Sequence, residues 1–291
     1  MEADNSDKGL YKGEDDYGTT YYYRGNVSNN YVKFADFYWK IIRINGDGSI
    51  RLLFNGDNNN DNISLSQFNS TRNNPAYGGY MYGKIGSSTY EEAYANTNNS
   101  TIKEIIDEWF KEHIVANNYA KYLENNVGFC GNRKVVSGDG LANNKETNYY
   151  SYTKYINGIA SFRCTDVDNN FLENDYYTMK IADSGNKALT YPVGLITYDE
   201  LIYSGMNRKY INNLAFTHSQ KSYWTMTPLK YDNSYLTADV MIADSSGNIN
   251  GWTPVSYSYY VRPVINLKAN VKITGGIGTT NNPFVIETGE K

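Results

Sequence analysis

The chain has 291 residues, of which 40% are hydrophobic, 15% aromatic and 20% charged, and its formal net charge is -4. An aromatic content this high excludes a disordered chain, and no run approaches the roughly 20 apolar residues that a membrane-spanning helix needs. The slight acidity argues against a nucleic-acid binder that relies on neutralising phosphates.

Strand patterns dominate the first part of the chain. Tyr21–Val27 predicts a strand, and residues 31–44 predict a longer one. Asn45–Gly48 contains Asn-Gly and Asp-Gly, the residue pairs of tight hairpins, so residues 49–54 should return antiparallel to the preceding strand. Residues 55–99 are polar and rich in glycine, which predicts a long loop.

Helix patterns occur twice. Thr101–Glu104 has the spacing of a capping box, and apolar residues then repeat at intervals of three and four, which predicts a helix over 101–115. Thr197–Tyr203 predicts a second, shorter capped helix that Gly205 stops. The last third returns to strand patterns, at Tyr223–Pro228, Thr237–Ala243, Tyr260–Leu267, Val271–Thr274 and Pro283–Ile286. Two or three helices among many short, mostly antiparallel strands indicate an α+β fold.

The two ends of the chain differ from the middle in composition. Met1–Asp7 is polar and acidic, a start expected where an export or anchoring segment has been removed. Residues 1–18 are rich in Asp, Gly and Lys, and we expect them to be flexible. Residues 19–291 contain no internal repeat and no linker, which predicts a single domain.

The chain contains two cysteines, Cys130 and Cys164, each next to an aromatic residue. We expect a disulfide between them, which would close a loop of about 33 residues and contribute about 3–4 kcal/mol through loop closure. A cytosolic protein with two reduced, buried thiols is the alternative.

Signatures of metal binding and catalysis are missing. Two runs begin with the spacing of a calcium loop but lack its glycine and its final glutamate: Asp57, Asn59 and Asp61, and Asp166, Asp168 and Asn170. Each run fits either a solvated loop or an irregular calcium site, and we expect no other cofactor. His113 and His218 have no zinc-binding partners in the sequence, and no nucleophile elbow or phosphate loop occurs. No carboxylate pair stands out for glycoside hydrolysis.

Asparagine and tyrosine are in excess, with about forty Asn and 30 Tyr against 10 Phe. An AT-rich genome would give this excess through codon usage, so local clustering has to support any functional inference. Three stretches cluster such residues: Asn73–Gly83, Tyr231–Tyr235 and Trp252–Tyr260. Flat rings for stacking and amides that read hydroxyl groups are typical of carbohydrate or protein recognition.

The candidate ligand-contacting residues are therefore Tyr231, Asp232, Tyr235, Trp252, Tyr257, Tyr259 and Tyr260. The alternative is that many of these rings cover a sheet. For Trp252, packing in the core is favoured over ligand contact, because a Trp between strands is usually a core residue.

The chain resembles a family of uncharacterised secreted or membrane-tethered surface proteins of Gram-positive bacteria in four phrases: Tyr38–Arg51, Tyr191–Glu200, Tyr223–Pro228 and Val261–Leu267. Residues from about 190 to 270 are similar to domains with the C-type-lectin fold, which formylglycine-generating enzymes and phage tropism determinants share. This resemblance implies ligand contacts just before the closing strand, at Trp252–Tyr260. The calcium-binding motifs of lectins and the late cysteines of formylglycine-generating enzymes are absent, so neither chemistry is implied.

The leading hypothesis is an extracellular, C-type-lectin-like module at the cell surface, tethered to membrane or wall by segments outside this sequence. It would bind a glycan or a host or bacterial surface protein through Tyr- and Asn-rich loops, with no nucleic-acid partner. A pilin-like or surface-layer subunit whose partner is itself is the second hypothesis. A secreted hydrolase is the third.

Overall fold

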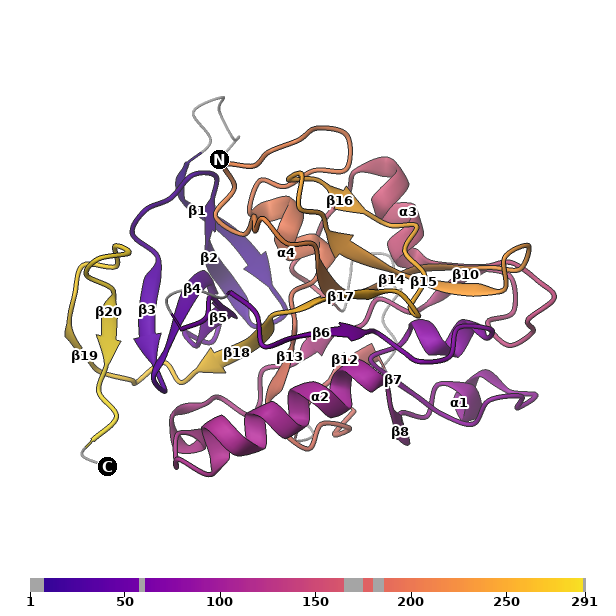
Figure 1. Cartoon of the computed structure of the whole chain (residues 1–291), viewed down its shortest axis with the longest axis horizontal. Helices are drawn as coiled ribbons and strands as arrows, with labels where there is room; N and C mark the ends of the chain where they lie inside the picture. The colour runs from indigo at the N-terminus through magenta and orange to yellow at the C-terminus, as the bar shows by residue number, and fades with distance from the viewer. Residues whose placement is uncertain (1–7, 58–60, 165–174, 180–185, 290–291) are drawn as a thin grey trace.

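The computed structural model describes residues 8–57, 61–164, 175–179 and 186–289. Within these ranges the chain forms two main β-sheets flanked by short helices (Figure 1). The α+β fold class predicted from the sequence is confirmed.

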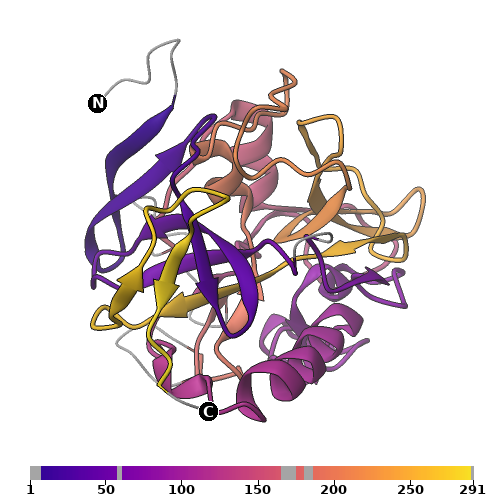
Figure 2. The ribbon, with the colours of Figure 1, turned by 60° about the vertical axis from the view of Figure 1, so that its left-hand side comes forward.

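The first sheet brings together strands from both ends of the chain. Its strands are β1 (Gly9–Asp15), β2 (Gly18–Arg24), β3 (Tyr31–Phe34), β4 (Phe37–Ile44), β5 (Ile50–Phe54), β13 (Val193–Leu195), β18 (Pro263–Leu267), β19 (Ile273–Gly275) and β20 (Phe284–Ile286). The main path runs β13–β18–β5–β4–β3–β20–β19, and the β1–β2 hairpin joins it at β4. Among the described strands of this sheet, only β20 and β3 pair in parallel. Figure 2 shows the β19–β20 pair in yellow.

The second sheet is built mainly from the last third of the chain. Its strands are β6 (Ser64–Gln67), β10 (Val135–Ser137), β11 (Thr147–Tyr149), β14 (Tyr223–Asp232), β15 (Thr237–Ala243), β16 (Ile249–Asn250) and β17 (Ser258–Val261). The order is β10–β11–β14–β15–β16, with β17 pairing both β14 and β6. The long β14–β15 hairpin is its centre (Figure 1).

Shorter elements complete the described part of the chain. Two small ladders pair β7 (Met81–Tyr82) with β8 (Asn98–Asn99) and β9 (Phe129–Cys130) with β12 (Tyr176–Tyr177). The α-helices are α1 (Tyr90–Ala93), α2 (Thr101–Phe110), α3 (Tyr150–Asn157) and α4 (Tyr198–Tyr203), and 3-10 turns cover Pro75–Gly78 and Ala120–Tyr122. None of the helices in the described ranges combines the length and the hydropathy that crossing a membrane requires.

The chain crosses from the second sheet to the first at Arg262. The single strand expected over Tyr260–Leu267 is therefore divided into β17 and β18. The buried Arg262 guanidinium donates to the backbone oxygens of Phe54 and Thr217, each at 3.1 Å, and lies 4.7 Å from the centre of the Tyr223 ring. Because Phe54 ends β5 and Tyr223 begins β14, this one side chain ties the two sheets together.

Two buried tryptophans mark the core on either side of this crossing. The Trp39 ring packs edge-on against Phe54, with 5.2 Å between ring centres, and its Nε1 donates to the Phe34 carbonyl at 3.0 Å. The Trp224 Nε1 donates to the Ser66 carbonyl at 2.8 Å. Both indole nitrogens are thus satisfied, as burial of a polar group requires.

The hairpin predicted across Asn45–Gly48 is confirmed as β4 and β5. The strand expected over 31–44 contains a further reversal, because Ala35 and Asp36 form a two-residue turn between β3 and β4 with φ of 54° and 66°. Tight hairpins favour such left-handed turns, which usually hold Asn or Gly. Ala-Asp carries no such signal, so the sequence did not reveal the turn.

The flexible segment expected over residues 1–18 is not found at residues 9–15, which form β1. Each residue of β1 pairs with a residue of β2, and the buried Asp15 carboxylate lies 2.5 Å from Arg43 of β4. This ion pair anchors the end of the strand. Residues 1–7 lie outside the described residues.

The predicted helix over 101–115 is confirmed as α2, followed by a π-helical turn over Lys111–Val115. Its cap is Ser100 and not the expected Thr101: the Ser100 Oγ accepts a hydrogen bond from the Lys103 backbone nitrogen at 3.4 Å and donates to the Tyr80 carbonyl at 2.7 Å. The second predicted helix is confirmed as α4, with Thr197 and Glu200 forming its capping box. Apolar residues of α2 pack against β13 and β6.

Ser100→Ala should lower the free energy of unfolding by about 1 kcal/mol, the usual cost of losing a helix cap. Thr101→Ala is the control and should cost less, because the Thr101 hydroxyl makes an exposed hydrogen bond, 3.0 Å from the Ser70 nitrogen. Urea unfolding of both variants measures the difference. A larger loss at Thr101 would show that the helix starts one residue later.

Candidate functional site

A pocket of about 440 Å³ opens between three segments that are distant in the sequence. We call it the amide pocket. Its described lining consists of Asn73, Asn74, Ile85, Gly86, Ser87, Ser88, Leu141, Ala142 and Asn143. These segments lie where α1, β10 and the β14–β15 turn come together, at the right of Figure 1. The lining combines amide and hydroxyl side chains with aliphatic ones, and none of its residues ionises.

Local turn chemistry holds two walls of the amide pocket together. The Asn74 side chain caps the following 3-10 turn by accepting from the Ala76 nitrogen at 3.0 Å, and it donates to the Leu141 carbonyl at 3.1 Å. Asp139 accepts from the backbone nitrogens of Leu141 and Ala142, both at 2.9 Å, and these bonds lower the pKa of Asp139 to about 2. Hydrogen bonds within and between the loops therefore fix these two walls of the pocket.

The end of β14 and the β14–β15 turn contain three of the predicted residues, and hydrogen bonds join this region to residues 143–144 beside the amide pocket. Tyr235 is 75% exposed. Asp232 organises the turn by accepting from the Ser234 nitrogen at 2.9 Å and by pairing with Lys230 at 2.9 Å. Tyr231, which is predicted to contact a ligand, has a fully buried ring.

Tyr231 is hydrogen-bonded to one wall of the amide pocket. Its hydroxyl donates to the Asn143 carbonyl at 3.1 Å, and Asn233 donates to the Asn144 carbonyl at 3.3 Å. The amide of Ala238 donates to the Arg72 carbonyl at 2.8 Å, next to the first pocket residue. The turn is thus tied to both sides of the amide pocket.

None of the seven predicted residues belongs to the described lining of the amide pocket, and the other four lie on other segments. Trp252 is 49% exposed, so the favoured placement in the core is wrong: it lies on the loop after β16, with its ring against Tyr155. Tyr257 is 53% exposed. Tyr259 is half-buried with its ring edge-on to Trp224, and Tyr260 lies under Lys221.

The sequence reasoning found part of the pocket and missed the rest. Asn73 and Asn74 belong to a stretch that was singled out, whereas residues 85–88 and 141–143 were not. The run Asp139–Asn144 is rich in turn-forming residues and could have been read as a loop. Nothing in the sequence indicates that it meets residues 73–74.

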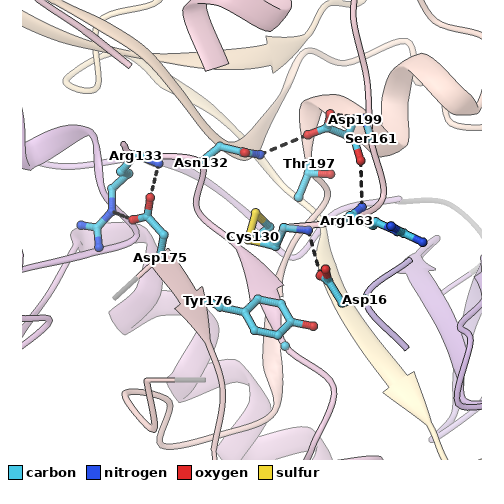
Figure 3. Close-up of a disulfide and its surroundings, with 12 residues drawn as sticks. Asp16, Cys130, Asn132, Arg133, Ser161, Arg163, Asp175, Tyr176, Thr197 and Asp199 are labelled. Atoms are coloured by element: carbon cyan, nitrogen blue, oxygen red, sulfur yellow. Dashed lines mark hydrogen bonds and ion pairs between the residues drawn. A yellow bond between two sulfur atoms is a disulfide. The ribbon is translucent and has the colours of Figure 1, made fainter. Parts of the chain in front are cut away.

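A second polar region surrounds the disulfide. The predicted bond between Cys130 and Cys164 is present, with the Cα atoms 5.5 Å apart (Figure 3). Beside it is a cavity of about 20 Å³ whose lining includes four carboxylates, from Asp15, Asp16, Asp199 and Glu200. This volume holds about one water molecule and no sugar ring.

Three of these carboxylates form buried ion pairs. Asp15 pairs with Arg43, Glu200 pairs with Arg51 and lies 3.5 Å from Arg43, and Asp199 lies 3.1 Å from Lys154. All of these side chains are more than nine-tenths buried. Because each cation compensates a buried carboxylate, these pairs help to hold the fold together.

The metal and histidine candidates give no site within the described residues. Asn59 and the run Asp166–Asn170 lie outside them. In the ranges that the structure covers, no group of three or more His, Cys, Asp or Glu side chains is placed to hold a metal ion. His113 packs its ring against Phe37 and Trp109.

Asp239 of β15 is a further buried carboxylate. It is 4% exposed, and its Oδ1 has no hydrogen-bond partner among the described residues. Burial raises the pKa of Asp239 to about 7; the hydrogen bond with Thr237 and the cations Lys230 and Arg72 oppose this, and Asp232 adds to it.

Asp239→Asn should remove a pH dependence of stability between about pH 4 and pH 7. The carboxyl ionises near pH 4 in the unfolded chain and near pH 7 in the folded one, so the folded state binds more protons in this window. The free energy of unfolding of the wild type therefore falls as the pH rises, by at most about 4 kcal/mol from this group. The variant should be more stable than wild type at pH 7 and similar at pH 4, as measured by urea unfolding.

Asp232→Asn is the matched control for this series. Despite partial burial, its hydrogen bond with Lys230 lowers the pKa of Asp232, so its replacement should lower stability at pH 7. An unchanged pH slope in Asp239→Asn would contradict the assignment to Asp239.

Comparisons with protein-family models, with curated protein sequences and with solved structures found no match to this chain. A function therefore has to be proposed from the side chains described above. The fold class alone does not supply one, because a single fold commonly carries unrelated functions.

Proposed function

We propose that this chain is an extracellular binding module that recognises a neutral glycan in the amide pocket. The observation that carries the proposal is the lining of that pocket, in which Asn73, Asn143 and two serines stand beside aliphatic groups and no charged residue. Amides donate to and accept from sugar hydroxyls, and aliphatic groups suit the apolar faces of a sugar ring. An exposed ring, Tyr235, stands on the neighbouring turn.

The disulfide supports an extracellular location, since such bonds persist in oxidising compartments. The C-type-lectin-like and Gram-positive surface-protein resemblance is part of the same proposal. That resemblance implies a contact face at residues 252–260, whereas the amide pocket uses residues 73–74, 85–88 and 141–143. One variant in each face, Asn143→Ala and Tyr257→Ala, distinguishes the two possibilities.

Asn143→Ala should weaken binding of a neutral glycan about tenfold, because it removes the hydrogen bonds of one side chain from the pocket. The Asn143 side chain is exposed, and its backbone bond to Tyr231 is kept, so the fold should be preserved. A glycan array identifies the ligand, and titration calorimetry then measures the affinity. The affinity should change little with added salt, since no charges pair.

Tyr257→Ala is the matched control, because this ring is exposed outside the amide pocket. It should bind as the wild type does. Loss of binding in Tyr257→Ala alone would move the site to residues 252–260. No binding to any glycan, together with self-association of the purified chain, would favour the pilin-like alternative.

A further inference from the structure

A buried lysine, asparagine and aspartate meet beside the disulfide. The Lys154 Nζ lies 3.1 Å from the Asp199 Oδ1 and 3.4 Å from the Asn132 Oδ1, and the Asn132 Nδ2 donates to the Asp199 Oδ2 at 3.1 Å. Figure 3 shows Asn132 and Asp199 facing one another. The three side chains thus form a closed ring of contacts.

Each member of this triad is held in place by a different element. Asn132 follows β9, with a left-handed φ of 52°, two residues after the disulfide-bonded Cys130. Lys154 lies in the last turn of α3, and Asp199 in the first turn of α4. The backbone nitrogen of Ser161 donates to the Asp199 Oδ1 at 2.8 Å and fixes that carboxylate.

The triad is almost fully buried. The exposed fractions are 1% for Lys154, 8% for Asn132 and 3% for Asp199, and the Lys154 Nζ lies 5.4 Å from the centre of the Tyr150 ring. An amine held against an amide in this way has the advantage of an intramolecular reaction, whose effective concentration exceeds any in solution. The low exposure to bulk water also limits competing hydrolysis.

We propose that Lys154 and Asn132 are joined by an isopeptide bond that forms with the help of Asp199. The Asp199 carboxylate takes a proton from the Lys154 ammonium, and the free amine attacks the Asn132 Cγ. A C–N bond forms between Nζ and Cγ, and the bond from Cγ to Nδ2 breaks.

The protons and charges balance without any oxidant or co-reactant. The attacking nitrogen gives up two protons: one converts the departing Nδ2 group to ammonia, and the other stays on Asp199 as a neutral carboxyl. The two oxygens of Asp199 already contact the attacking and the leaving nitrogens, which suits a proton carrier between them. A neutral carboxyl also suits a buried site that no longer holds a cation.

The bond would clamp the two ends of segment 132–154. This segment carries residues 141–143, one wall of the amide pocket. The cross-link is independent of the proposed ligand, because it follows from the triad alone.

Intact-mass spectrometry of the reduced full chain tests the proposal directly. The wild type should be lighter than its sequence by about 17 Da, the mass of ammonia. After alkylation and trypsin, a branched product should join residues 122–133 to residues 146–163, because trypsin cannot cleave at an acylated Lys154. A wild-type mass equal to that of the sequence would overturn the proposal.

Three variants test which side chains take part in the loss of ammonia. Lys154→Arg keeps the charge but has no amine to acylate, and Asp199→Asn removes the proton carrier, so both should have the full sequence mass of the variant. Lys103→Arg is the matched control: Lys103 is an equally buried lysine paired with Asp107, and that variant should keep the deficit. A deficit that persists in Lys154→Arg would place the ammonia loss at another asparagine and overturn the assignment.

Discussion

Two neighbouring carboxylates in the first turn of α4, Asp199 and Glu200, hold the centre of the molecule together. Glu200 compensates Arg43 and Arg51 of the first sheet, and Asp199 contacts Lys154 of α3 and Asn132. Burying these charges is costly, and removing one partner would leave the other without compensation. The position of α4 therefore fixes how the first sheet, α3 and the disulfide region meet. Helix α3 comes directly after the segment that contains residues 141–143, one wall of the amide pocket.

Much of the local structure could be predicted from the sequence, because its signals lie within a few residues of one another. The Asn45–Gly48 turn, the apolar face of α2 and the Thr197 capping box each depend on neighbouring residues, and the structure contains all three. The disulfide was predictable since the chain offers a single pair of cysteines. The cap of α2 shifted by one residue because Ser100 and Thr101 are both good caps, and only packing distinguishes them.

What the sequence could not show are contacts between distant segments. The strand pattern around Arg262 reads as continuous, and only the two sheets reveal that the chain changes sheet there. Tyr231 looked like a surface ring because its neighbours are polar, whereas its hydroxyl supports a pocket wall through Asn143. Three loops line the amide pocket, so no local pattern in any one of them predicts it. Helix α3 was also missed, since its tyrosine-rich sequence has a weak helical pattern.

Asp199 contacts both ends of segment 132–154 and thereby holds one wall of the amide pocket. Hydrogen–deuterium exchange of Asp199→Asn against the wild type tests it most directly. We predict faster exchange over residues 139–149 and unchanged exchange over the hairpin at residues 31–54. Unchanged exchange over residues 139–149, or a uniform increase along the whole chain, would contradict the claim.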